Sequence, residues 1–154
     1  AKRVTHWPQL ILGFTFNWGA LLGYLAARGG IEAPAVLLYL AGVAWTLFYD
    51  TIYAHQDKQD DRSIGVRSTA LLFGAASRAW LAGFALTTIG LLAAAALSAE
   101  LHWPVCIGLA AAAAQLAWQL WRVDLDRPES CLRAFRSNRD FGLIVLAALL
   151  AGAW

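Results

Sequence analysis

Long apolar blocks separated by shorter polar stretches dominate this chain. A helix that crosses the hydrocarbon core of a bilayer needs roughly 20 apolar residues, and five blocks approach or reach that length. We draw these spans at 7–27, 34–54, 79–97, 103–121 and 141–154. Pro34 and Pro104 open two of them, a position suited to the first turn of a helix. The pattern therefore predicts an all-α, multi-spanning transmembrane helical bundle of about five spans.

The polar connections between these blocks differ in charge. Those after the first and third spans are short and nearly neutral, whereas those after the second and fourth are longer and charged. With the amino terminus in the cytoplasm, only Arg28 of the 12 Lys and Arg residues falls outside, as the positive-inside rule requires. We therefore predict a multi-pass protein of the bacterial inner membrane, with an acidic loop at 55–68 on the cytoplasmic side.

The composition supports a membrane protein and excludes several other classes. Hydrophobic residues make up 60% of the chain and charged residues 14%, against about 25% charged in soluble domains. A soluble, very alanine-rich bundle is the alternative. Cys106 lies in an apolar run and Cys131 in a polar stretch, so we expect two free thiols. We find no nucleophilic triad, no phosphate-cradling glycine loop and no nucleic-acid-binding surface, so no nucleic acid is expected as a partner.

An acidic segment at the end of the second span carries the candidate chemistry. Asp50 lies within the apolar run, where a carboxylate is by default a functional-site hypothesis. If the helix continues, Asp57 and Asp61 fall about 20° to either side of Asp50 and Asp60 points elsewhere. Three carboxylates on one face suit Mg²⁺, which prefers carboxylates together with substrate phosphates. A solvated charged loop is the alternative, which the intramembrane position of Asp50 disfavours.

The run from Tyr49 to Ala70 closely resembles the second aspartate-rich motif of the UbiA superfamily. In detail it is similar to that of the 4-hydroxybenzoate polyprenyltransferases of ubiquinone biosynthesis. Two flanking segments also fit: Lys2–Gln9 resembles the family's loop before its fifth helix, and Cys131–Arg139 its last cytoplasmic loop. The resemblance covers essentially the whole chain, as the carboxy-terminal half of a prenyltransferase.

The resemblance implies a nine-helix bundle around a cavity open to the lipid bilayer. Two aspartate-rich motifs would hold Mg²⁺ against a polyprenyl diphosphate, and the second motif falls here on Asp57 and Asp61. A lysine that contacts the diphosphate falls on Lys2. The first motif, which begins Asn-Asp, does not occur in the 154 residues. We therefore expect a fragment that is inactive and unstable without a missing amino-terminal half.

The expected reaction is transfer of the polyprenyl group to the aromatic ring of 4-hydroxybenzoate. Asp57 and Asp61 would act through the metal, as a Lewis acid on the leaving diphosphate. Lys2 and Arg67 would stabilise the charge that develops on the diphosphate. Asp50 would orient the acceptor or support the metal.

Other readings stay open. A related prenyltransferase could use a naphthoate, homogentisate or haem as acceptor, and a non-catalytic membrane subunit that needs a partner half is a different class. A transporter fits less well, because the acidic cluster lies at the end of a span rather than at the midplane.

Several single residues have two interpretations. Trp18, Trp45 and Trp118 lie deep in their spans and either pack in the core or line a cavity. Asn138 is interpreted as a helix cap at the start of the last span. Glycine and alanine within the spans are expected to let helices approach closely. The arginines from Arg122 to Arg139 are interpreted as topology determinants and lipid-headgroup contacts.

Overall fold

The protein forms a bundle of four long helices in the computed structural model, which describes residues 29–30, 32–56, 76–125 and 127–152. The helices are α3 (Ala33–Gln56), α6 (Ser77–Ser98), α7 (Pro104–Arg122) and α8 (Pro128–Gly152). No strand occurs among these described residues, which confirms the all-α prediction. The expected span at 7–27 and most of the expected acidic loop lie outside the described residues.

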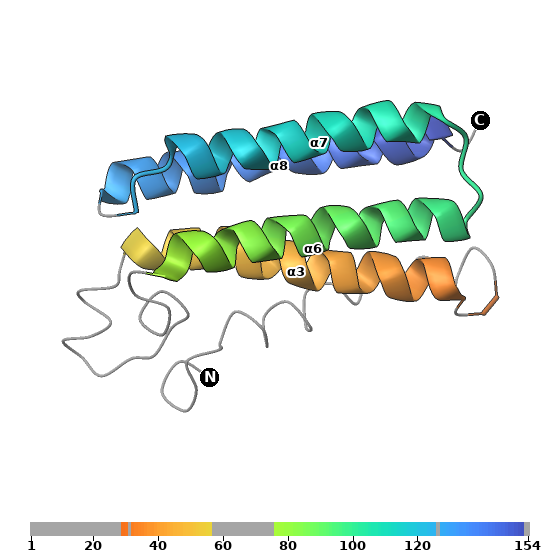
Figure 1. The fold of residues 1–154 in the computed structure, drawn as a ribbon, viewed down its shortest axis with the longest axis horizontal. Helices are drawn as coiled ribbons and strands as arrows, with labels where there is room; N and C mark the ends of the chain where they lie inside the picture. The colour runs from red at the N-terminus through yellow and green to blue at the C-terminus, as the bar shows by residue number, and fades with distance from the viewer. Residues whose placement is uncertain (1–28, 31, 57–75, 126, 153–154) are drawn as a thin grey trace.

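The four helices run up and down in chain order and close into a ring. α3 packs against α6, α6 against α7, α7 against α8, and α8 returns to α3. In Figure 1 the α3–α6 pair lies below the α7–α8 pair, and the end of α3 lies at the same end of the bundle as the starts of α6 and α8. This closure brings residues of α3 beside residues of α8 that are about 90 positions later in the chain.

Proline and backbone capping set the ends of the helices. Pro34, Pro104 and Pro128 lie in the first turns of their helices. Proline lacks an N–H, and this costs nothing there because first-turn N–H groups have no hydrogen-bond partner within the helix. α6 ends in a Schellman motif: the N–H of Glu100 donates to Leu97 O over 3.1 Å and that of Leu101 to Ala96 O over 3.0 Å. Glu100 takes φ 55°, the left-handed conformation that this motif requires and that glycine usually supplies.

Large apolar side chains fill the centre of the ring and also cover its outside. Phe48, Ile52, Leu81, Leu116 and Phe141 are almost fully buried. Leu86, Leu97 and Ile107 point outward and are 75%, 80% and 63% exposed. α3, α6 and α7 are each long and apolar enough to cross a membrane. An apolar exterior of this kind suits lipid rather than water, so the soluble-bundle alternative is rejected.

Glycine allows α7 and α8 to approach closely, as the small-residue pattern predicts. A Cβ placed on Gly108 would overlap both Cβ and Cα of Ala148, and one placed on Gly152 would lie 2.9 Å from Val105 Cβ. At the other end of α7, the guanidinium of Arg78 donates to the carbonyls of Leu120 and Val123. At one end of the bundle, α7 and α8 therefore pack backbone to backbone at glycine. At the other end, hydrogen bonds from the Arg78 guanidinium join α6 to the end of α7.

The last helix is longer than the sequence pattern predicts. We drew its apolar span from Phe141, with the polar stretch around Cys131 as a loop, yet α8 begins at Pro128. Cys131, Ala134, Asn138 and Phe141 are buried on one face of α8, at spacings of three or four residues that match a helical stripe. The polar side chains between them point away from the bundle, which is why this half of α8 does not look like a membrane span. Both cysteines are free thiols, as expected.

Candidate functional site

Basic side chains collect at one end of the bundle. Five of the six arginines of the described segments lie toward the end where α3 stops and α8 begins, namely Arg78, Arg122, Arg127, Arg133 and Arg136, and Arg139 lies about halfway along α8. The carboxylates Asp124 and Glu129 lie at the same end. The opposite end holds Glu32, Glu100 and His102. This separation agrees with the charge pattern of the sequence and identifies the end at which an anionic substrate would be attracted.

A groove between α3 and α8 opens near this basic end. Trp45 and Tyr49 of α3 and Phe135, Arg136, Asn138 and Arg139 of α8 line a volume of about 340 Å³. Its rings pack against one another: between ring centroids, Tyr49 lies 5.2 Å from Trp45 and 5.7 Å from Phe135. Tyr53 continues the series at 4.7 Å from Phe135. The groove thus combines an aromatic wall with two guanidinium groups.

Asn138 holds the groove together through a buried amide network. Its Oδ1 accepts from Trp45 Nε1 at 2.9 Å and from Gln119 Nε2 at 3.1 Å. Its Nδ2 donates to Gln119 Oε1 at 3.0 Å and to the carbonyl of Ala134 at 3.1 Å. The earlier interpretation of Asn138 as a helix cap is wrong, because it lies well inside α8. Its amide instead joins α3, α7 and α8 and sets the orientation of the Trp45 ring.

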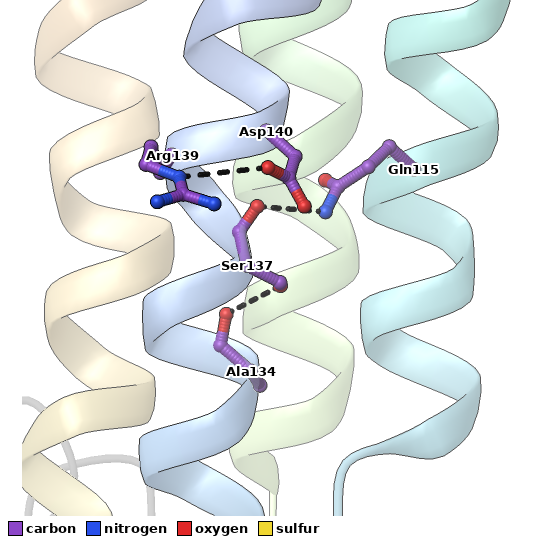
Figure 2. A network of polar contacts seen from close by, with 5 residues as sticks. All are labelled: Gln115, Ala134, Ser137, Arg139 and Asp140. Carbon is purple, nitrogen blue, oxygen red and sulfur yellow. Dashed lines mark hydrogen bonds and ion pairs between the residues drawn. The ribbon is translucent and has the colours of Figure 1, made fainter.

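The network extends along the α7–α8 interface. Gln119 Nε2 donates to Gln115 Oε1 at 2.6 Å, and Gln115 Nε2 donates to the carbonyl of Ser137 at 3.0 Å. Figure 2 shows Gln115 reaching across from α7 to α8, where the Ser137 hydroxyl donates to Ala134 O at 2.7 Å. Arg139 Nε lies 3.7 Å from Asp140 Oδ1, with both side chains largely exposed. This ion pair is weak enough to leave the Arg139 guanidinium available to a ligand.

Of the five site residues predicted from sequence, the structure describes one. Asp50 lies in α3, is half-buried and follows Tyr49 of the groove in the sequence, but it is not among the residues that line the groove. Asp57, Asp61, Lys2 and Arg67 lie outside the described residues, so their roles stay predictions. α3 ends at Gln56, one position before Asp57 in the sequence. Within the described segments, no group of three His, Cys, Asp or Glu side chains is placed to hold a metal ion.

The groove itself was only partly foreseen. Trp45 was expected either to pack in the core or to line a cavity, and its ring does both: it packs against the core and also lines the groove. Phe135, Arg136 and Arg139 were assigned to a loop and were missed as groove residues. Their spacing was a usable signal: Trp45, Tyr49 and Tyr53 recur every four residues, and Arg136 and Arg139 are three apart, so each set shares a helix face.

Residues 1–151 match the model of the UbiA prenyltransferase family. The chain belongs to the UbiA prenyltransferase family. Among UbiA relatives, a protein named mitochondrial 4-hydroxybenzoate polyprenyltransferase from Arabidopsis thaliana is 53% identical over 98% of this chain and 37% of its own length. The proteins of the same name from Bos taurus and Homo sapiens are 49% and 48% identical, each over 98% of this chain and 41% of their own length. The chain thus spans about two fifths of these UbiA relatives. No solved structure matches it significantly.

The relatives correct one prediction. Charge pattern and resemblance led us to expect a bacterial inner membrane, but these UbiA relatives are named mitochondrial and come from eukaryotes. The bacterial location is therefore wrong as a prediction. The multi-spanning character stands, since it rests on the three helices long and apolar enough to cross a membrane.

Proposed function

We propose that this chain supplies the second aspartate-rich half of a 4-hydroxybenzoate polyprenyltransferase. The observation that carries the proposal is the identity of about 50% to proteins of that name across nearly the whole chain. The groove supports it, because one of its two walls belongs to α3, which ends one position before Asp57 in the sequence. Polyprenyl diphosphate and 4-hydroxybenzoate are the substrates, and the bilayer houses the polyprenyl tail.

The aspartates are proposed to hold Mg²⁺. Asp57 and Asp61 supply carboxylate oxygens, the hard ligands that this ion prefers alongside substrate phosphates. Asp50, in α3, is proposed to add a further carboxylate. When bound, Mg²⁺ neutralises charge on the leaving diphosphate. Lys2 and Arg67 bind the same diphosphate and stabilise the charge it gains as the allylic carbon–oxygen bond breaks.

The groove is proposed to take the aromatic acceptor. Its volume of about 340 Å³ lies within the usual range for small-molecule pockets, roughly 300–1,000 Å³. Trp45, Tyr49 and Phe135 present ring faces and edges against which an aromatic acid can pack. The guanidinium groups of Arg136 and Arg139 pair with its carboxylate. Held in this way, the ring would present the carbon ortho to its hydroxyl to the allylic carbon. A bond between these two carbons would form as the diphosphate leaves, and the ring carbon would then lose its proton to water.

A complete site needs the first aspartate-rich motif, which the 154 residues do not contain. The relatives extend well beyond the matched region. We therefore propose that catalysis requires this chain to be paired with an amino-terminal half that carries the Asn-Asp motif.

The test is prenyl transfer in membranes, using radiolabelled 4-hydroxybenzoate, a polyprenyl diphosphate and Mg²⁺. The chain is assayed alone and co-expressed with the amino-terminal half of a related enzyme. Product is expected only in the paired sample, and Asp57→Ala or Asp61→Ala should abolish it. Asp60→Ala is the matched control, because Asp60 is predicted to point off the metal-binding face.

Two outcomes would overturn the proposal. Product from this chain alone would mean that two motifs are not needed. Product with a naphthoate or homogentisate but not with 4-hydroxybenzoate, in a paired sample shown to be inserted and folded, would assign a different acceptor.

A further inference from the structure

A second hollow lies at the basic end of the bundle, on the α7–α8 side. Its volume is about 270 Å³, and its walls come from the end of α7 and the start of α8. The lining residues are Trp118, Gln119, Arg122, Val123, Ser130, Arg133 and Ala134. The set contains two cations from different helices, a hydroxyl and an amide, and no carboxylate. Such a lining favours an anion with several oxygen acceptors.

The two cations are not neutralised by the surrounding described residues. Among these, the one ion pair within 4.0 Å joins Arg139 to Asp140, and neither Arg122 nor Arg133 takes part in it. Arg122 instead lies 5.6 Å from the centroid of the Trp121 ring, a cation–π contact that leaves its N–H groups available. Ser130 accepts from the backbone N–H of Asp124 at 2.8 Å, so its hydroxyl proton is free to donate.

The surroundings of the hollow belong to the membrane surface. Trp118 and Trp121 are 42% and 77% exposed at the last turn of α7, a helix apolar enough to cross the bilayer. Exposed tryptophans at the end of a span mark the headgroup level. An anion that binds between Arg122 and Arg133 therefore sits where lipid phosphates are most concentrated, with its acyl chains able to run down past the tryptophan rings.

We propose that this hollow binds the phosphate of an anionic phospholipid headgroup, with Arg122 and Arg133 as its two cationic ligands and Ser130 as a hydroxyl donor. The site is separate from the α3–α8 groove, since the two share no lining residue. Basic pockets between membrane helices commonly take such headgroups. The lipid would join α7 to α8 on the side away from the substrate groove and stabilise the bundle without entering the reaction.

The test measures lipid preference of the protein in nanodiscs of phosphatidylcholine with a minor fraction of phosphatidylglycerol. Spin-labelled phosphatidylglycerol and phosphatidylcholine report which lipid the protein immobilises. The unaltered protein should prefer phosphatidylglycerol. Arg122→Gln with Arg133→Gln should lower that preference by about tenfold or more, because two charge-assisted contacts to the headgroup phosphate are lost.

Arg136→Gln with Arg139→Gln is the matched control, because it removes two positive charges, as the test pair does, from positions of α8 outside the hollow. It should lower the preference by no more than about twofold, the loss expected from general surface charge. Arg122→Lys with Arg133→Lys keeps both charges and should retain most of the preference, which separates loss of binding from loss of fold.

Three results would overturn the inference. The first is an unaltered protein with no preference for phosphatidylglycerol. The second is an equal loss in the two glutamine pairs, which would assign the effect to net charge alone. The third is displacement of the labelled lipid by inorganic diphosphate, which would assign the hollow to a soluble phosphate. None of these results depends on prenyl transfer, so failure here is distinct from failure of the proposed function.

Discussion

At the scale of single residues, the most informative position is Asn138. A lone amide inside an apolar helix is costly unless both its oxygen and its nitrogen are paired. Here the oxygen accepts from Trp45 and Gln119, and the nitrogen donates to Gln119 and to its own helix. The amide is therefore satisfied by partners on two other helices, and one side chain fixes how α3, α7 and α8 meet.

Replacing Asn138 by leucine should destabilise the bundle by about 1–3 kcal/mol, because Trp45 Nε1 and the Gln119 amide lose their buried partner. The free energy of unfolding in mixed micelles measures this loss. Ser137→Ala is the neighbouring control, because within the part of the chain that the structure describes the Ser137 hydroxyl bonds only to the carbonyl of Ala134 in its own helix. This substitution should cost less than about 0.5 kcal/mol. Equal losses in both variants would show that the network does not join the helices.

The arginines of the groove give a functional prediction that rests on the proposed acceptor site. In the reconstituted paired enzyme, Arg136→Gln with Arg139→Gln should raise KM for 4-hydroxybenzoate by about tenfold or more, because charge-assisted bonds to the carboxylate are lost. KM for the polyprenyl diphosphate should stay within about twofold, since the groove arginines are not proposed to contact that substrate. Arg127→Gln, outside the groove, serves as the control. A rise in both KM values would instead place these arginines at the diphosphate.

At the scale of elements, α8 shows how a polar segment can belong to a packed helix. Its first half carries arginines and an aspartate, so a hydropathy window misses it. One face is still apolar enough to be buried against α3 and α7. The helix keeps its charged side chains outward at the membrane surface, where their long stems can reach the headgroups.

The close approach of α7 to α8 predicts a steric effect at Gly108. Gly108→Ala should destabilise the bundle by about 1–3 kcal/mol, because the added methyl overlaps Ala148 and forces the helices apart. Gly90→Ala on α6 is the matched control: nothing lies within 4 Å of its added Cβ, and the change should be neutral or slightly stabilising through helix propensity. Thermal unfolding of the two variants in the same detergent measures the difference. A neutral Gly108→Ala would contradict the close helix contact.

At the scale of the whole molecule, the bundle has an apolar girdle and one basic end. Leu86 lies near the middle of α6 and points outward, whereas Arg127 is exposed in the turn before α8. Both residues face away from the protein. If the helices cross the bilayer, Leu86 is surrounded by lipid hydrocarbon and Arg127 by water at the membrane surface.

Cysteine labelling should reveal this girdle. In a Cys106→Ser background, Leu86→Cys should react with a water-soluble maleimide only after detergent solubilisation, because a thiol in the hydrocarbon core is neither ionised nor reached by the reagent. Arg127→Cys should react at once in opened membranes. Rapid labelling of Leu86→Cys in an intact bilayer would contradict α6 as a membrane span.

Much of the element level follows from sequence because it depends on local composition. The limits of α3, α6 and α7 fall within a few residues of the apolar runs, since each helix satisfies its own backbone hydrogen bonds and needs only length and apolarity to span lipid. The start of α8 was misjudged because the apolar residues of its first half form a single stripe along the helix. That stripe is recognised as a buried face only when α3 and α7 are seen to pack against it. The site residues Asp57, Asp61, Lys2 and Arg67 stay predictions, and Asp50 alone among them has a described position.

The sequence by itself determined the all-helical membrane class, the separation of charge along the chain and the aspartate run that relates the chain to its family. These properties are carried by residues close together in the chain. Only the tertiary structure decided that Trp45 and Asn138, 93 positions apart, share a hydrogen bond, and that two arginine-lined hollows flank α8. Such pairings depend on which helices are neighbours in the bundle. That arrangement is set by side-chain packing across the whole bundle rather than by any local pattern.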